Sequence, residues 1–341
     1  MSERSQSFAL KSLMRWETLL FFLLIASLIW GAERSPYFWE GSNFKVATST
    51  FMERAIMALP MTLIIISGEI DLSVASILGL ASAVMGKAWM NDWPLWACII
   101  LALVVGATCG LFNGLLVTWM RLPSLVVTLG TLALFRGLAY VVLGSNAVSD
   151  YPQKFNDFGF NTITGTTIPW STLIFVALLA IFLVLLHRSR AGRQIYAVGL
   201  NQEAARYSAV RVARLKLWLF VLSGTIASVA GILFTARVSS SRADNAVGFE
   251  LDVIAAVLLG GVSIFGGKGT LVGVALSLAV VATIRNALGI TNVGPELQSI
   301  VIGGLLILSV LGPNLVGRLT HVGRRSIVGL RGLSPGPSSG D

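Results

Sequence analysis

Apolar residues run along this chain in ten long segments separated by short polar ones. A helix that crosses a bilayer needs about 20 mostly apolar residues. Segments that approach this length lie near 17–33, 46–68, 71–90, 95–120, 123–144, 170–187, 215–236, 250–266, 270–290 and 296–313. The first closes without a small-residue cleavage site, so we expect a retained anchor rather than a signal peptide. The pattern predicts an all-α integral membrane protein, a polytopic bundle of about ten transmembrane helices.

Basic residues between these segments indicate the orientation. When span-end residues are counted with the nearer loop, sixteen Lys and Arg fall on the side of the two chain ends and seven on the other side. The remaining two, Arg54 and Arg136, lie within spans. Cytoplasmic loops carry the excess of positive charge. We therefore expect both termini in the cytoplasm and an even number of spans.

Polar stretches divide the chain into one membrane domain and two tails. We expect a cytoplasmic tail over 1–16, a transmembrane domain over 17–313 and a second cytoplasmic tail over 314–341. The last tail is rich in Ser, Pro and Gly and cannot bury enough apolar surface to order itself. Two long connections interrupt the domain: a turn-rich one at 145–169, expected outside, and a strongly basic one at 188–214, expected inside.

The amino-acid composition is that of a protein surrounded by lipid rather than by water. Of 341 residues, 55% are hydrophobic and only 12% are charged, whereas soluble domains carry about a quarter charged residues. The net charge of +9 does not indicate nucleic acid, because the basic residues sit between apolar runs. Cys98 and Cys109 share one apolar run and are expected to pack as small hydrophobic residues. With only His187 and His321 as histidines, we expect no metal centre and no cofactor.

The basic connection contains the most informative stretch, Gly199–Val212. Asn201 suits a helix N-cap, and Glu203 would then lie in the first turn, where its charge complements the helix dipole. A short amphipathic helix parallel to the membrane is the local prediction. Two interpretations remain open: the helix anchors to lipid headgroups, or it is the docking site for a cytoplasmic partner.

Several motifs in order make the chain resemble a known family. They are Gly68-Glu69-Ile70-Asp71-Leu72-Ser73-Val74, Gly110-Leu111-Phe112-Asn113-Gly114, Leu122-Pro123-Ser124 through Thr128-Leu129-Gly130-Thr131, Arg136-Gly137, the 199–212 stretch, and Leu259-Gly260-Gly261 through Gly266-Gly267-Lys268-Gly269. From about residue 45 to 313 the chain is similar to permease subunits of ATP-binding-cassette importers for ribose, galactose, xylose, rhamnose and autoinducer-2. The family usually has two glycines where this chain has Gly68-Glu69, and this departure marks a subgroup. The wider match most resembles the rhamnose and autoinducer-2 members.

The resemblance implies a bacterial inner-membrane permease that is not itself an enzyme. It implies cytoplasmic ATPase subunits, a periplasmic sugar-binding protein and a second permease copy or sister permease as partners, and translocation by alternating access. The residues it assigns to coupling with the ATPase are Asn201, Glu203, Ala204, Ala205, Arg206, Tyr207 and Ser208. Residues 261–266 begin like a phosphate-binding loop, but Gly267 replaces the required lysine, so ATP is expected to bind a partner. Gly68, Asp71, Gly266 and Gly267 are candidate helix-turn or gating positions.

Polar residues inside spans are further candidates, because charge is costly in lipid. Arg136 either lines the translocation path or holds a neighbouring helix. Asn113 either bonds across helices or contacts a sugar hydroxyl. Glu53 and Arg54 are expected to snorkel towards the outer surface, and Asp71 to cap the next helix.

Three other functions compete with an ATP-driven sugar permease. An ion-coupled secondary carrier usually places a carboxylate deep in the bundle, and the carboxylates here are expected at span edges. A branched-chain amino-acid permease from a related importer group remains an alternative. A membrane-embedded enzyme is disfavoured, because no nucleophile with a base and no His-Glu metal set falls within the spans.

Overall fold

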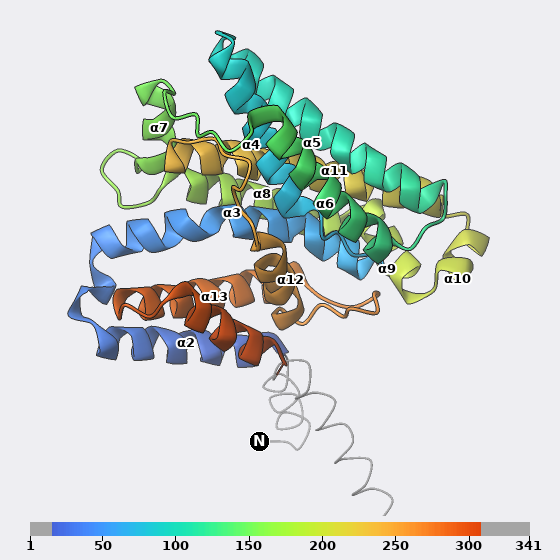
Figure 1. Ribbon diagram of the computed structural model, residues 1–341. Coiled ribbons are helices and arrows are strands. Elements are labelled where there is room, and N and C mark those ends of the chain that lie inside the picture. Colours follow the sequence, from blue (N-terminus) through green and yellow to red (C-terminus); the bar gives the residue numbers. More distant parts are fainter. Residues whose placement is uncertain (1–15, 308–341) are drawn as a thin grey trace, which may run out of the picture.

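The computed structural model describes residues 16–307. The expected tails over 1–16 and 314–341 lie outside this range, Trp16 excepted, as does the end of the last predicted span. The elements, drawn in Figure 1, are α2 (Trp16–Arg34), the 3-10 helix η1 (Pro36–Trp39), α3 (Gly41–Ile66), α4 (Val74–Met90), α5 (Leu95–Thr118), α6 (Ser124–Leu143), α7 (Gln153–Phe160), α8 (Trp170–Arg188), α9 (Arg190–Leu200), α10 (Gln202–Tyr207), α11 (Val212–Val238), α12 (Phe249–Leu259), α13 (Leu271–Ile290) and a final helix, Pro295–Ile307.

The described part of the chain contains helices and two isolated β-bridges, with no sheet. Seven of its helices are long and apolar enough to cross a membrane, and α4 and Pro295–Ile307 are shorter apolar helices. Large apolar side chains are exposed along α2, α5, α6 and α8, as expected of surfaces that contact lipid or another membrane helix. The predicted all-α membrane class is confirmed.

Helix α3 is the centre of the bundle, and nearly every residue from Phe51 to Ile66 is buried. Around it pack α8, α11, α12 and α13, while α5 and α2 form the outer layer against α11 and α13. Figure 1 shows α7 at one end of the bundle and α9 and α10 at the opposite end.

Glycines bring α5 and α11 into backbone contact. A Cβ on Gly110 of α5 would meet the carbonyl oxygen of Phe220, and a Cβ on Gly224 of α11 would meet backbone atoms of Gly106 and Gly110. Small residues are favoured at such interfaces because van der Waals contact between close backbones drives association in lipid. The Gly-rich motif around Asn113 therefore has a packing function.

The predicted span 250–266 is wrong as a full crossing. Helix α12 covers only Phe249–Leu259, 11 residues, which is about 17 Å at 1.5 Å per residue. It is preceded by a non-helical stretch, 239–248, that runs along α4: Ser241 lies against Gly86, and Asn245 donates to Ser82 at 3.1 Å, one helical turn further along α4. The apolar run that suggested a full span continues past α12 into the turn at Gly260 and Gly261.

Both long connections are more ordered than the composition predicts. The 145–169 connection contains α7, and Tyr151 stacks on Trp89 with ring centroids 5.8 Å apart. The 188–214 connection contains α9 and α10, of 11 and 6 residues.

Candidate functional site

Two short helices form the end of the bundle that the sequence motifs single out. The Ser189 hydroxyl accepts from the Gly192 N–H at 3.1 Å and caps α9. The Asn201 side chain accepts from the Ala204 N–H at 3.0 Å and caps α10. The predicted N-cap at Asn201 and the predicted short helix are both confirmed, with Glu203 in the first turn.

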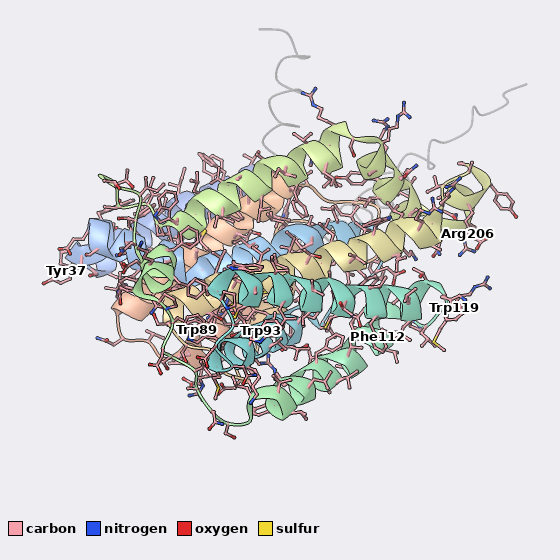
Figure 2. All side chains as sticks on the ribbon, turned by 90° about the horizontal axis from the view of Figure 1, so that it is seen from above. Tyr37, Trp89, Trp93, Phe112, Trp119 and Arg206 are labelled. Atoms are coloured by element: carbon pink, nitrogen blue, oxygen red, sulfur yellow. The ribbon has the colours of Figure 1, made fainter. Side chains whose placement is uncertain are left out.

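Helix α10 has one buried side and a broad exposed one. Ala205 packs with Val198 of α9 and Val212 of α11 in a small apolar cluster. Tyr207 is 90% exposed, and Glu203 and Arg206 form a surface ion pair at 3.3 Å. Six of the seven residues predicted for coupling are exposed, namely Asn201, Glu203, Ala204, Arg206, Tyr207 and Ser208. Figure 2 shows Arg206 and Trp119 at this end of the molecule and Tyr37 at the other.

An ion pair connects α10 to the membrane helices. Lys216, near the start of α11, donates to the Glu69 carboxylate in the turn between α3 and α4, and also to Gln202 Oε1 of α10 at 3.1 Å. The side chains of Lys216 and Glu69 are 8% and 13% exposed. Glu69 is the residue that departs from the family pattern, and its partner follows 147 positions later.

Glycine-mediated backbone contacts reinforce this connection. The Gly267 N–H donates to the Ile66 carbonyl at 2.8 Å, and a Cβ on Gly199 would meet that same carbonyl. Gly68, Gly266 and Gly267 all have positive φ, at 84°, 83° and 71°, where a side chain is strained. The predicted turn positions Gly68, Gly266 and Gly267 thus meet at one point, which we call the junction: residues 66–69, 199–202, 266–267 and Lys216.

Asp71 and Asn113 belong to a second polar cluster next to the junction. The Asp71 carboxylate is fully buried and accepts from the Ser73 N–H at 3.0 Å, from the Ser73 hydroxyl at 2.6 Å and from the Ser223 hydroxyl at 2.9 Å. Asn113 is also fully buried and donates to Ser73 Oγ at 2.8 Å. Of the two interpretations left open for Asn113, this geometry favours bonding across helices.

Arg136 holds the non-helical stretch before α12. Its guanidinium donates to the carbonyls of Ala243 at 2.6 Å, Asn245 at 2.8 Å and Ala75 at 3.2 Å. A Cβ on Gly79 would collide with it, so glycine makes room for it against α4. Non-helical backbone at membrane depth is tolerated only where its polar groups are satisfied. Arg136 supplies those donors, which favours its holding role.

Glu53 and Arg54 do not snorkel, and that prediction is wrong. Glu53 is 1% exposed and accepts from Arg237 at 2.7 Å. Arg54 pairs with Asp252 of α12 at 2.9 Å, and Arg285 of α13 binds the other oxygen of the same carboxylate. The expected edge placement of the carboxylates is wrong for Glu53 and Asp71, since both are deep in the bundle. Arg237 lies 184 positions from Glu53, and Asp252 lies 198 positions from Arg54, so only the burial of charge in an apolar run signalled these two pairs.

Comparisons with known proteins decide the family. A family model described as "Branched-chain amino acid transport system / permease component" matches residues 45–310. This chain belongs to that permease family. Two relatives are named autoinducer 2 import system permease protein LsrD. The one from Photorhabdus temperata is 34% identical to this chain, over 88% of this chain and 91% of the relative. The one from Yersinia enterocolitica is 35% identical, over 88% of this chain and 92% of the relative.

A solved chain described as an inward-facing metal-chelate type ABC transporter is 15% identical, with a TM-score of 0.45, over 90% of this chain and 98% of that chain. As a permease component, the protein is a multi-pass inner-membrane subunit that performs no catalysis of its own. Importers of this kind place ATP hydrolysis on a separate subunit and work with a binding protein.

Proposed function

We propose that this permease carries a small sugar-like solute inward by alternating access, driven by ATP hydrolysis on partner subunits. Autoinducer 2 is the first candidate solute, and rhamnose or a ribose-type sugar the next. The support is the 33–35% identity to autoinducer 2 import permeases over almost nine tenths of the chain.

The observation that carries the proposal is the two-sided placement of α10. One side is tied to the turn between α3 and α4 through Gln202, Lys216 and Glu69. The other side leaves Tyr207 and Glu203 exposed for a partner. A helix in this position transmits rigid-body movement of an ATPase subunit to α3 and α4. In this proposal Gly68, Asp71, Gly266 and Gly267 act as turn positions about which those segments reorient.

The same proposal fixes sidedness and assembly. In this proposal the α9–α10 end faces the cytoplasm and the α7 end faces the periplasm, which the excess of basic residues on the α9–α10 side supports. The described chain has a helix at each of the ten predicted spans, so we infer ten membrane segments within 17–313, with α12 and residues 239–248 together forming one of them. The functional unit is a permease dimer, with itself or a sister permease, on two ATPase subunits and beneath a periplasmic binding protein.

Uptake by the reassembled importer tests the proposal. Inner-membrane vesicles holding the permease, its ATPase and its binding protein should accumulate autoinducer 2, L-rhamnose or D-ribose only with ATP. Uptake that persists without the ATPase subunit contradicts it and favours an ion-coupled carrier. The family description favours one second candidate, branched-chain amino acids. Leucine uptake in the same vesicles, with no sugar uptake, would select it.

A further inference from the structure

A short turn between α12 and α13 projects from the same end of the bundle as α10. Residues 263–268 form this turn, and Figure 1 shows it as the orange loop that extends towards α9. Among the described residues, the two large hydrophobic side chains with the greatest exposed fractions are Phe265, at 91%, and Tyr207 of α10, at 90%. The end that carries the predicted coupling residues therefore presents a second aromatic side chain, on a different element.

Hydrogen bonds within the turn fix its shape. The Ser263 N–H donates to the Lys268 carbonyl at 3.0 Å, and the Gly266 N–H donates to the Ser263 carbonyl at 2.9 Å. The Ser263 hydroxyl accepts from the Phe265 N–H at 3.3 Å. Positive φ at Gly266 and Gly267 closes the turn directly after the phenylalanine. The exposed ring is therefore carried on a backbone that local contacts hold in place.

Three contacts fasten the turn to the ends of α3 and α9. The Gly267 N–H donates to the carbonyl of Ile66, the last residue of α3, at 2.8 Å. A Cβ on Gly267 would lie 2.7 Å from a methyl group of Leu200, the last residue of α9. The Tyr196 hydroxyl of α9 donates to the Gly269 carbonyl at 2.7 Å. Helix α10 begins two residues after Leu200, so a protein that covers α10 also lies next to the turn.

The exposure of Phe265 differs from that of the apolar side chains on the membrane helices. The exposed residues of α5, α6 and α8 lie along the sides of long apolar helices, where lipid or another helix covers them. Phe265 lies in a turn at the end of the bundle, three residues before the exposed Lys268. Together with Ile264 and Leu200, 48% and 66% exposed, it forms a small apolar surface. Aromatic side chains that insert into a pocket of a partner carry much of the binding energy of protein interfaces.

We propose that residues 263–268 are a second docking site for the ATPase subunit, and that Phe265 is the anchor, inserted into an apolar pocket on that subunit. The inference rests on the proposed coupling through α10. Because the turn and α10 are both fastened to the ends of α3 and α9, a subunit that binds both moves these helix ends as one body instead of rotating α10 alone. The cost of ordering the contact is low, since the backbone of the turn is already fixed before binding. Insertion of the ring among lipid headgroups is the competing outcome that the experiments separate.

Binding of the ATPase subunit measures the contribution of the anchor. The purified permease in lipid nanodiscs is titrated with the ATPase subunit of the same importer. Phe265→Ala should raise the Kd for that subunit about tenfold or more, the loss expected of an aromatic hot spot. Tyr37→Ala, which removes an exposed ring at the opposite end of the molecule (Figure 2), should leave the Kd unchanged. Equal Kd values for the two variants overturn the docking site alone. If the wild-type permease binds no ATPase subunit, the proposed function is overturned and this inference with it.

A fluorescent label beside the anchor reports what covers it. Ile264→Cys labelled with bimane keeps Phe265, and the wild-type cysteines Cys98 and Cys109 are buried. Addition of the ATPase subunit should shift the bimane emission to shorter wavelength, because the bound subunit excludes water from the label. The same label on Tyr37→Cys should not respond. Emission from the turn that a saturating concentration of the ATPase subunit leaves unchanged overturns the proposal. Quenching of the label by lipids brominated in their acyl chains, with or without the ATPase subunit, assigns the turn to the membrane and also overturns it.

Discussion

The ammonium of Lys216 lies against the carboxylate of Glu69, and the two side chains are almost entirely buried at the point where α3 ends. The same ammonium donates to the side-chain oxygen of Gln202 in α10 at 3.1 Å. One cation of the membrane helix α11 therefore binds both the short surface helix α10 and the turn that follows α3. A buried pair of this kind is costly to break by removing one partner, because the other charge stays buried without compensation.

Lys216→Met should therefore destabilise the protein by about 3–5 kcal/mol. The loss is measurable as a lower midpoint of thermal unfolding in detergent. The double variant Glu69→Gln with Lys216→Met removes both charges and should recover most of that loss. A single variant as stable as wild type, or a double variant no better than the single one, would show that the pair does not hold the junction together.

Replacing Glu203 and Tyr207 by alanine should uncouple ATP hydrolysis from transport. Both side chains point away from the bundle, so their loss leaves the Ala205 cluster and the fold intact. The ratio of solute transported to ATP hydrolysed in proteoliposomes should fall severalfold, with normal insertion.

Tyr37→Ala is the matched control for the coupling variants, because this tyrosine is 62% exposed at the opposite end of the molecule (Figure 2). It should leave the coupling ratio unchanged. Failure of the Glu203 and Tyr207 variants to insert would instead assign these residues to folding, and an unaltered ratio would remove α10 from the transmission path.

The sequence predicts the helices far better than it predicts the contacts between charges. Apolar length locates α2, α3, α5, α6, α8, α11 and α13, and capping chemistry locates α10. Apolar length fails at α12, because glycines in an apolar run do not reveal whether the run continues as helix or turns. Positive φ at Gly261 makes the turn there.

Pairs such as Glu53 with Arg237 could not be predicted, because 184 positions separate them and any of several cations could have served. The family resemblance located Asn113 and Arg136 without assigning them a function. The hydrogen-bond partners of Asn113 and Arg136 depend on how α4, α5 and α6 pack. That packing depends on close contacts at glycines, and the sequence does not show which backbone each glycine contacts.

Alkaline pH should destabilise the protein through Tyr151. Burial raises the pKa of this phenol from 10.0 to about 12, and its hydroxyl is hydrogen-bonded to Ser241 at 2.7 Å. The unfolded chain ionises near pH 10, so stability is unchanged below that value and falls as pH rises towards 12, by about 2–3 kcal/mol in total. Unfolding midpoints at about pH 8 and about pH 11 measure the effect.

Tyr151→Phe is the control for this pH dependence. The phenylalanine ring keeps the stack on Trp89 but cannot ionise. Its unfolding midpoint should fall less than that of wild type between the two pH values. An equal fall in both proteins would place the alkaline sensitivity elsewhere.

Gly110→Ala should destabilise the contact between α5 and α11. The added Cβ would meet the Phe220 carbonyl and lie 2.9 Å from the Cα of Val221, and both are backbone atoms that cannot rotate away. Overpacking of this kind costs about 1–3 kcal/mol, measurable by thermal unfolding in detergent.

Gly130→Ala is the matched control for Gly110→Ala, because a Cβ on this α6 glycine meets nothing within 4 Å. It should leave stability unchanged or raise it by up to about 1 kcal/mol through helix propensity. If the two variants lose equal stability, the loss reflects glycine replacement in general, and the close approach of α5 to α11 is not what stabilises the bundle.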